Sequence, residues 1–284
     1  MKLGVDGLLP EWSSIQYQTA RRVRDAGFLG ATMRFNRPLE TDLEQVRRLK
    51  TILDRAGLRA AQVNGWYEVL VHPDSERRAA GVRGLQRLVQ FGTILAAETV
   101  YVRPGSMHPE GGWQPHPDNH KPETLARLAD SLRAACETAA AEGIPLAIEG
   151  HVLSPLDTPA RTAELIGAVA SPWLKFNTDP ANFIGSVRAA HDTRPTLEDL
   201  HRRLGPVTAA GHAKDVRLGP EMVLSIRECL LGTGTLDYGM FLRHFAQDCP
   251  DGFLLIEHLP DEQVAQARAN LLRLADDAGI TFEY

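Results

Sequence analysis

Two patterns of apolar and polar residues alternate along the chain. Short apolar runs such as Thr99–Val102 and Phe253–Glu257 are typical of buried β-strands. Longer stretches with apolar residues three and four positions apart, such as Asp42–Ala56, predict amphipathic helices, and glycine at position 57 suits the end of that helix. The regular alternation of the two patterns predicts βα units built around a parallel sheet.

Eight such units can be counted. The predicted strands are Lys2–Asp6, Leu29–Phe35, Arg59–Asn64, Thr99–Val102, Pro145–Glu149, Trp173–Asn177, Val207–His212 and Phe253–Glu257. The predicted helices are Ile15–Ala26, Asp42–Ala56, Ser75–Ala97, Glu123–Glu142, Thr158–Val169, Leu197–Leu204, Asp237–Ala246 and Glu262–Ala278. We therefore expect an α/β protein in which residues 1–284 form one (β/α)8 TIM-barrel domain.

An open, doubly wound sheet is the alternative arrangement of the same units. Its dinucleotide-binding version carries a GxGxxG turn after the first strand, whereas this chain reads GVDGLLPEW there. The barrel is favoured for that reason. Its long loops (65–74, 104–122, 180–196 and 213–235) would follow strands and surround the C-terminal face, where barrel active sites lie.

Composition narrows the classes of function. The net charge of the 284-residue chain is -5, which disfavours a nucleic-acid partner. No apolar run approaches the roughly 20 residues of a membrane span, and the N-terminus lacks the pattern of a signal peptide. Three widely spaced cysteines, Cys136, Cys229 and Cys249, predict no disulfide framework. We expect a cytoplasmic protein that acts on a small molecule.

Four polar residues stand at the ends of consecutive predicted strands: Glu149, Asp179, His212 and Glu257. Any one of them alone would be read as part of a salt bridge or cap at the rim of the barrel. Together they would converge, and three buried carboxylates would repel one another. A divalent cation relieves that repulsion, and this donor set suits Mn2+, Co2+, Mg2+ or Zn2+. The sequence therefore predicts one metal site at these four residues.

Several motifs resemble one superfamily. They are IE at the end of the fifth strand, TDPAN after the sixth, GHAKDVR at the seventh, GTGTLDY before the next helix, and LLIEH at the eighth. This pattern, spread over most of the chain, resembles the xylose isomerase-like TIM barrels. These include sugar and sugar phosphate isomerases and epimerases such as the tagatose epimerases, together with hydroxypyruvate isomerase and inosose dehydratase.

The resemblance implies a role for each matching residue. Glu149, Asp179, His212 and Glu257 match the four metal ligands, with Mn2+ the expected ion, and Glu149 and Glu257 also match the catalytic acid–base pair. The implied reaction is isomerisation or epimerisation of a small hydroxy-carbonyl compound through an enediolate. A metal-dependent dehydratase of the inosose type is the alternative, because expulsion of a β-hydroxyl starts from the same ligands.

The substrate contacts are expected around this centre. Asn182 stands where many epimerase-type members have histidine, and an amide binds a hydroxyl but is no acid. Lys214 and Asp215 are expected behind the ligands. The remaining expected substrate contacts are Asn64, Trp66, His151 and Arg217.

Two further functions share this fold. An abasic-site endonuclease would need several metals, more histidine ligands and a basic groove, and is disfavoured by the acidic balance. A non-catalytic sugar-binding barrel would not need both glutamates. The sequence leaves homo-oligomer formation open.

Overall fold

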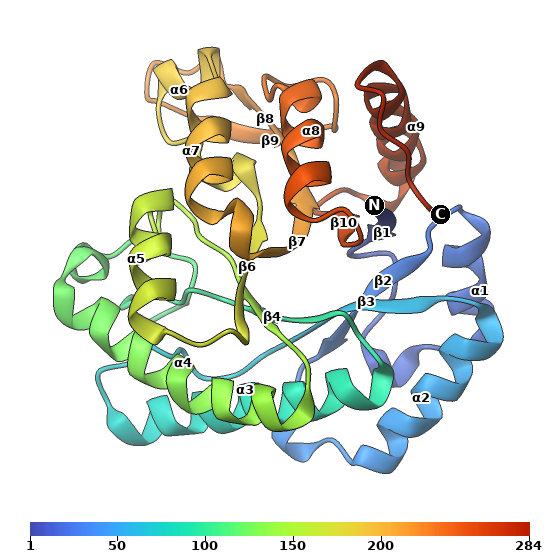
Figure 1. The fold of residues 1–284 in the computed structure, drawn as a ribbon, viewed down its shortest axis with the longest axis vertical. Helices are drawn as coiled ribbons and strands as arrows, with labels where there is room; N and C mark the ends of the chain where they lie inside the picture. Colours follow the sequence, from blue (N-terminus) through green and yellow to red (C-terminus); the bar gives the residue numbers. More distant parts are fainter.

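Eight parallel strands close on one another in the computed structural model, which describes residues 1–284 (Figure 1). The barrel strands are β1 (Lys2–Val5), β2 (Gly30–Phe35), β3 (Arg59–Gly65), β4 (Thr99–Val102), β5 (Leu146–Ile148), β6 (Leu174–Thr178), β7 (Thr208–Ala213) and β10 (Phe253–Ile256). They follow one another around the barrel in chain order, and β10 closes it by pairing with β1 from Lys2↔Phe253 to Val5↔Ile256. The predicted (β/α)8 barrel is confirmed.

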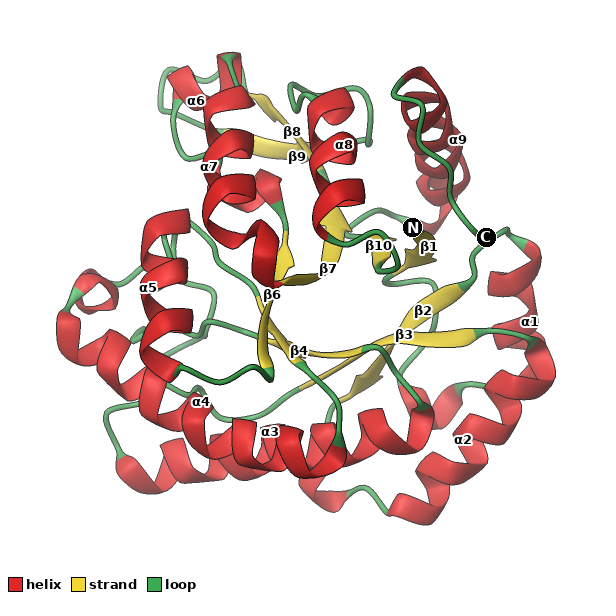
Figure 2. Cartoon of the chain, viewed as in Figure 1, coloured by secondary structure: helices red, strands yellow, loops and turns green.

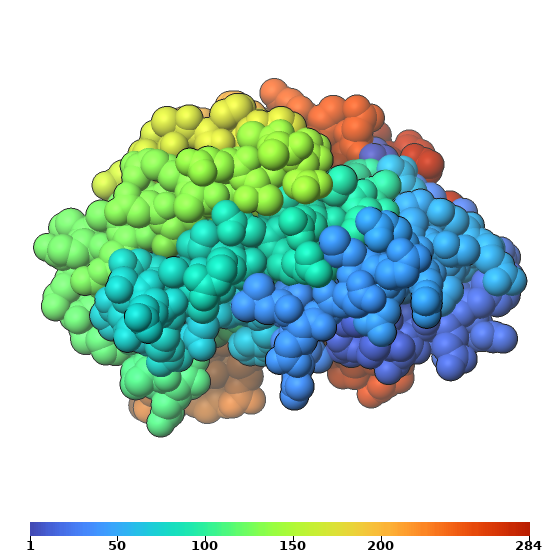
Figure 3. All heavy atoms as spheres, turned by 90° about the horizontal axis from the view of Figure 1, so that it is seen from below, coloured from blue at the N-terminus to red at the C-terminus, as the bar shows by residue number.

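Helices surround this ring of strands, as Figure 2 shows in red and yellow. They are α1 (Tyr17–Asp25), α2 (Leu43–Ala56), α3 (Ser75–Leu95), α4 (Pro122–Glu142), α5 (Pro159–Val169), α7 (Arg194–Leu204), α8 (Tyr238–Asp248) and α9 (Asp261–Asp277). Their apolar faces and the outward side chains of the strands form a buried core cluster of 56 residues. Seen from the side of α2 and α3, these helices cover the barrel in a continuous layer (Figure 3).

The helix ends follow local chemistry. Asp74 caps α3 by accepting hydrogen bonds from the backbone N–H groups of Glu76 and Arg77. Gly57 and Gly143 end α2 and α4 in the left-handed conformation, with φ of 69° and 71°. None of the helices is both long enough and apolar enough to cross a bilayer.

The loops on the C-terminal face contain structure that the hydrophobic pattern did not predict. An antiparallel hairpin of β8 (Asp215–Leu218) and β9 (Ile226–Cys229) follows β7, and a short helix, α6 (Val187–His191), follows β6. Both are largely exposed, so their sequences carry little apolar periodicity. Helix α7 begins at Arg194, earlier than the predicted Leu197, because Pro195 occupies its first turn.

Glycine lets α3 approach the loop that follows β3. A Cβ on Gly81 would overlap the backbone carbonyl oxygen of Glu68, and one on Gly84 would lie 2.6 Å from Cβ of Tyr67. These two glycines face the segment that carries Trp66 and Tyr67 toward the C-terminal mouth of the barrel. The close packing therefore fixes a loop beside the site described below.

We predict that Gly81→Ala destabilises the protein by about 1–3 kcal/mol, because the added methyl group meets backbone that must move. Gly167→Ala is the matched control. Gly167 lies in α5 with no atom within 4 Å of the added carbon, so alanine should stabilise by roughly 0.5–1 kcal/mol through helix propensity. Urea unfolding of both variants measures the difference, and stabilisation by Gly81→Ala would contradict the packing argument.

Candidate metal centre and active site

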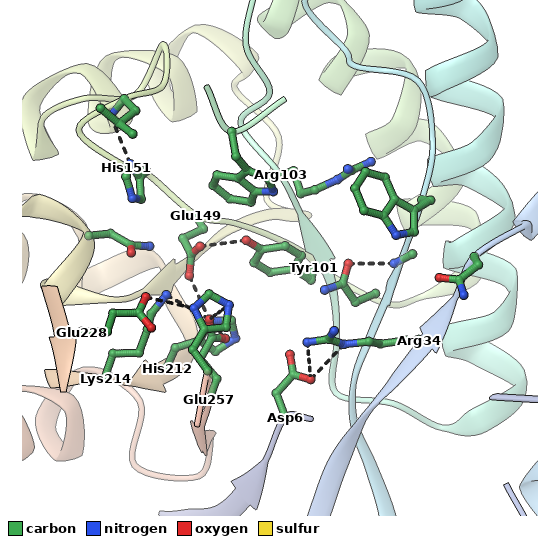
Figure 4. Close-up of a pocket in the computed structure, with 18 residues that line it drawn as sticks. Asp6, Arg34, Tyr101, Arg103, Glu149, His151, His212, Lys214, Glu228 and Glu257 are labelled. Atoms are coloured by element: carbon green, nitrogen blue, oxygen red, sulfur yellow. Dashed lines mark hydrogen bonds and ion pairs between the residues drawn. The ribbon is translucent and has the colours of Figure 1, made fainter. Parts of the chain in front are cut away.

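A cavity of about 380 Å3 opens at the C-terminal ends of the barrel strands (Figure 4). Eighteen residues line it, some from the strand ends and others from the long loops. The strand ends supply Asp6, Arg34, Asn64, Tyr101, Glu149, His212 and Glu257. The loops and the hairpin add Trp66, Trp113, His151, Asn182, Glu228 and His258. The cavity therefore lies on the face of the barrel where the sequence predicted a site.

The four predicted metal ligands converge at the base of the barrel mouth, where Glu149, His212 and Glu257 line the cavity and Asp179 is buried beside them. Glu149 follows β5, Asp179 follows β6, His212 lies in β7, and Glu257 follows β10, and all four are buried. Ligand atoms of Glu149, Asp179 and His212 all lie within 4.8 Å of one another. Glu257 joins them through Oε2, which lies 2.6 Å from Nδ1 of His212. Neighbouring parallel strands thus bring distant positions of the sequence to one point.

Lys214 supplies positive charge inside this cluster. Its Nζ lies 2.7 Å from Oδ2 of Asp179 and 2.9 Å from Oε1 of Glu257. The side chain is only 4% exposed, so these are buried ion pairs rather than contacts at the rim. Lys214 was expected behind the ligands, and in the structure it lies between two of them.

The charges of the cluster are not fully balanced by Lys214. Burial raises the pKa of Asp179 to about 7, and Lys214 offsets this only in part. Burial also opposes the charge on Glu257, yet His212 and Lys214 hold the pKa of that carboxyl well below its usual value. At neutral pH the cluster therefore holds ionised glutamates beside an aspartate that more positive charge would stabilise.

The donor atoms fit a divalent cation. Oδ1 of Asp179 is buried without a hydrogen-bond partner, and the close polar contacts of Asp179 Oδ2 and of His212 Nδ1 are ion pairs within the cluster. Buried polar atoms without partners are rare and costly in proteins. An imidazole nitrogen and carboxylate oxygens gathered this closely form the donor set of Mn2+, Mg2+, Co2+ or Zn2+. The three residues Glu149, Asp179 and His212 form a possible metal site.

Several functional contacts were missed by sequence reasoning. Tyr101 donates a hydrogen bond to Oε2 of Glu149 at 2.7 Å, and Asn177 donates to Oε1 at 3.0 Å. Asp6 accepts from Nε of Arg34 at 3.0 Å across the cavity from Glu228 (Figure 4). Asp6 ends the predicted first strand, as Glu149 ends the predicted fifth. Its position at a strand end could therefore have identified it from the sequence. Glu228 arrives on the hairpin, which the pattern did not predict.

The expected substrate contacts have different outcomes. Asn64, Trp66, His151 and Asn182 line the cavity. Arg217 does not: it is exposed on β8, paired in register with Arg227 of β9. Its neighbour Val216 is buried, and because side chains alternate along a strand, Arg217 lies on the exposed face of the hairpin. In this structure Arg217 therefore does not line the cavity, and its contact with a substrate stays a prediction.

Asp215 is buried, but it serves the loop that follows the hairpin. Its carboxylate accepts hydrogen bonds from backbone N–H groups of Val216, Gly232, Gly234 and Leu236. A Cβ on Gly234 would overlap this carboxylate, which explains the glycine. Asp215 therefore holds the GTGTLDY segment in place, and it does not line the cavity.

The comparisons with known proteins agree with this geometry. A sequence profile of the xylose isomerase-like TIM barrel family matches residues 20–275. The chain belongs to that family. No curated protein matches it significantly by sequence.

Solved structures extend the agreement on fold. A D-tagatose 3-epimerase-like protein superposes with a TM-score of 0.77 at 17% identity, with 98% of each chain covered. A 3-keto-D-glucoside 4-epimerase from E. coli has a TM-score of 0.73 at 18% identity, covering 97% of this chain and 99% of that one. A family member from Mycobacterium smegmatis, solved in complex with magnesium, has a TM-score of 0.74 at 17% identity, with 98% and 97% covered. At these identities the likeness shows the shared barrel.

We predict that Lys214→Met lowers the free energy of unfolding of the metal-free protein by about 3–5 kcal/mol, because it leaves buried carboxylates without their counter-ion. Denaturant unfolding in the presence of a chelator measures this loss. Lys50→Met is the matched control, since Lys50 pairs with Asp54 on the surface of α2 and should cost less than about 1 kcal/mol. Equal effects of the two variants would contradict the role given to Lys214.

Proposed function

We propose that this protein is a divalent-metal-dependent isomerase or epimerase of a small, sugar-like hydroxy-carbonyl compound. The observation that carries the proposal is the placement of two buried glutamates around one imidazole nitrogen. Oε1 of Glu149 lies 3.0 Å from Nδ1 of His212, and Oε2 of Glu257 lies 2.6 Å from it. Two carboxylates thus flank one point at the floor of the cavity.

Glu149, Asp179, His212 and Glu257 would hold the metal in this proposal, with Mn2+ the expected ion. When bound, the cation polarises the substrate carbonyl and stabilises the charge of the enediolate. The chain's own residues arrange the rest. Tyr101 and Asn177 each donate a hydrogen bond to Glu149, so its two oxygens are held in a fixed direction.

The two glutamates are proposed as the acid–base pair. Burial opposes the charge on both, but in the metal-free protein His212 keeps the pKa of each carboxyl below its ordinary value, so both are ionised near neutral pH; a bound cation would supply the positive charge in its place. One carboxylate removes the proton α to the carbonyl, and the other returns a proton to the opposite face or to the neighbouring carbon. Opposite-face return gives epimerisation, and return to the neighbouring carbon gives isomerisation.

The electrostatics of the cavity favour an uncharged substrate. The carboxylates of the cavity are Asp6, Glu149, Glu228 and Glu257, with Asp179 buried beside them against Lys214, and the permanently charged cations are Arg34, Arg103 and Lys214. A bound divalent ion would bring these charges close to balance, which leaves no net attraction for a phosphate group. Arg34 is also paired with Asp6, and Arg103 donates to the carbonyl oxygen of Tyr67. We therefore infer a neutral, unphosphorylated sugar.

Polar groups that remain free face that substrate. The side-chain nitrogen of Asn182 is buried without a hydrogen-bond partner, so it is available to a substrate hydroxyl. Trp66, 61% exposed at the mouth, lies over the guanidinium of Arg103 at 4.7 Å, and its open face suits stacking on a sugar ring. His151 and Asn64 complete the proposed contacts.

The proposal is tested by incubating the metal-loaded protein in D2O with a panel of ketoses, aldoses, inososes and hydroxypyruvate. Each compound is followed by NMR and mass spectrometry. Deuterium incorporated at carbon without loss of water would support isomerase or epimerase chemistry and give the substrate. Loss of water would establish the dehydratase instead. Substrate bound without any exchange would favour a sugar-binding barrel.

We predict that Glu149→Gln and Glu257→Gln each lower kcat by about 10²–10⁴-fold, because an amide accepts no proton from carbon. Glu228→Gln is the control in the same cavity, where the carboxylate pairs with His258 rather than His212, and a loss below tenfold is expected. Steady-state kinetics with the substrate found above measure all three. Full activity in both Glu149→Gln and Glu257→Gln would remove the acid–base assignment.

A further inference from the structure

A chain of buried polar side chains crosses the inside of the barrel beneath the proposed metal site. Gln62 of β3 donates through Nε2 to Oδ1 of Asn177 on β6 at 3.2 Å and to Oγ1 of Thr99 on β4 at 3.2 Å. Its Oε1 lies 3.1 Å from Nε2 of His212. Asn177 in turn donates to Oε1 of Glu149 at 3.0 Å. The chain therefore joins two proposed ligands, Glu149 and His212, through two amides.

Burying a chain of polar side chains inside the barrel costs free energy. Gln62 is 1% exposed and Asn177 is fully buried, at positions where barrels commonly carry branched aliphatic side chains. A buried amide costs free energy unless its donors and acceptors are matched. Every side-chain polar atom of these two amides has a partner. The hydrogen bonds of both amides are therefore satisfied. Such a polar layer indicates a role other than packing, because aliphatic side chains would fill the same space.

The chemistry of the groups fixes the direction of each hydrogen bond. An ionised Glu149 only accepts, so the NH2 group of Asn177 must face it and the Asn177 carbonyl oxygen must face Gln62. The NH2 group of Gln62 then donates to Asn177 and Thr99, so the Gln62 carbonyl oxygen must face His212. That oxygen only accepts, which requires a proton on Nε2 of His212. The other ring nitrogen, Nδ1, is thereby the one turned toward the carboxylates.

We propose that Gln62 and Asn177 are positioning residues that set the tautomer and ring orientation of His212, so that Nδ1 presents its lone pair to the metal. We call this chain of hydrogen bonds the relay. Because Glu149 only accepts hydrogen bonds, it fixes the orientation of both amides, and these in turn fix the proton of the imidazole on Nε2. It also orients Glu149, because the same Asn177 holds one of its oxygens. Two ligands from β5 and β7 are thus fixed by one network. The inference rests on the proposed function, since it needs a metal at this site.

The first test is the affinity of the whole protein for Mn2+, measured by titration calorimetry. Gln62→Met keeps the volume but offers His212 no acceptor, and should weaken Mn2+ binding by about 10–100-fold, the usual effect of removing a group that orients a metal ligand. Asn177→Leu should weaken it similarly. Gln62→Glu, whose protonated carboxyl can accept from His212 and donate to Asn177, should bind more tightly than Gln62→Met.

Thr99→Val is the matched control. It disturbs the same buried layer and removes a partner of Gln62, but leaves the path from Glu149 to His212 intact. Its affinity for Mn2+ should stay within a few-fold of that of the unmodified protein. A spectroscopic signature completes the test: in protein labelled with 15N-histidine and loaded with diamagnetic Zn2+, the His212 shifts should report a protonated Nε2 and a coordinated Nδ1.

The outcomes separate the two proposals. If the unmodified protein binds Mn2+ and Gln62→Met and Asn177→Leu bind it equally well, the relay is wrong while the proposed function stands. If Thr99→Val weakens binding as much as Gln62→Met does, the layer acts only through packing and the relay is again wrong. If the unmodified protein binds no divalent metal, the metal site itself is wrong, and both proposals fail.

Discussion

The structure depends on one electrostatic constraint, which is the burial of several carboxylates at a single point. Glu149, Asp179 and Glu257 follow β5, β6 and β10, which lie close together in the closed barrel with only β7 between β6 and β10, so their side chains meet. Each ionised carboxylate there lacks water and is repelled by the others. Positive charge is needed next to these carboxylates. His212 of β7 and Lys214, which directly follows β7, provide it. A divalent cation is the natural completion of such a cluster.

The barrel consists of layers with different roles. The outer surface of the strands and the inner faces of the helices form the apolar core, which makes the scaffold rigid. Inside, beneath the carboxylates, lies a layer of matched amides in place of aliphatic side chains. Above the carboxylates, the long loops and the hairpin build a polar cavity. The strands therefore fix the positions of the proposed ligands, and the loops shape the cavity above them.

The fold and the centre of the site could be predicted from the sequence because both follow from short-range patterns. Apolar periodicity gave the order of strands and helices, and the rule that parallel strand ends share one face brought Glu149, Asp179, His212 and Glu257 together. The exposed hairpin and α6 were missed, since exposed elements leave no apolar rhythm. The exposed place of Arg217 could not be predicted for the same reason, because its direction depends on the hairpin and its register.

The sequence by itself determined which residues end the strands, and therefore which carboxylates and which imidazole had to meet. Only the tertiary structure decided what lies between and beneath them. Lys214 bridges Asp179 and Glu257, and Gln62 reaches His212 from across the barrel, 150 positions away along the chain. A glutamine inside a strand reads as an ordinary polar residue in the sequence. Its role arises from the closure of the barrel, which places its amide opposite side chains that no local pattern relates to it.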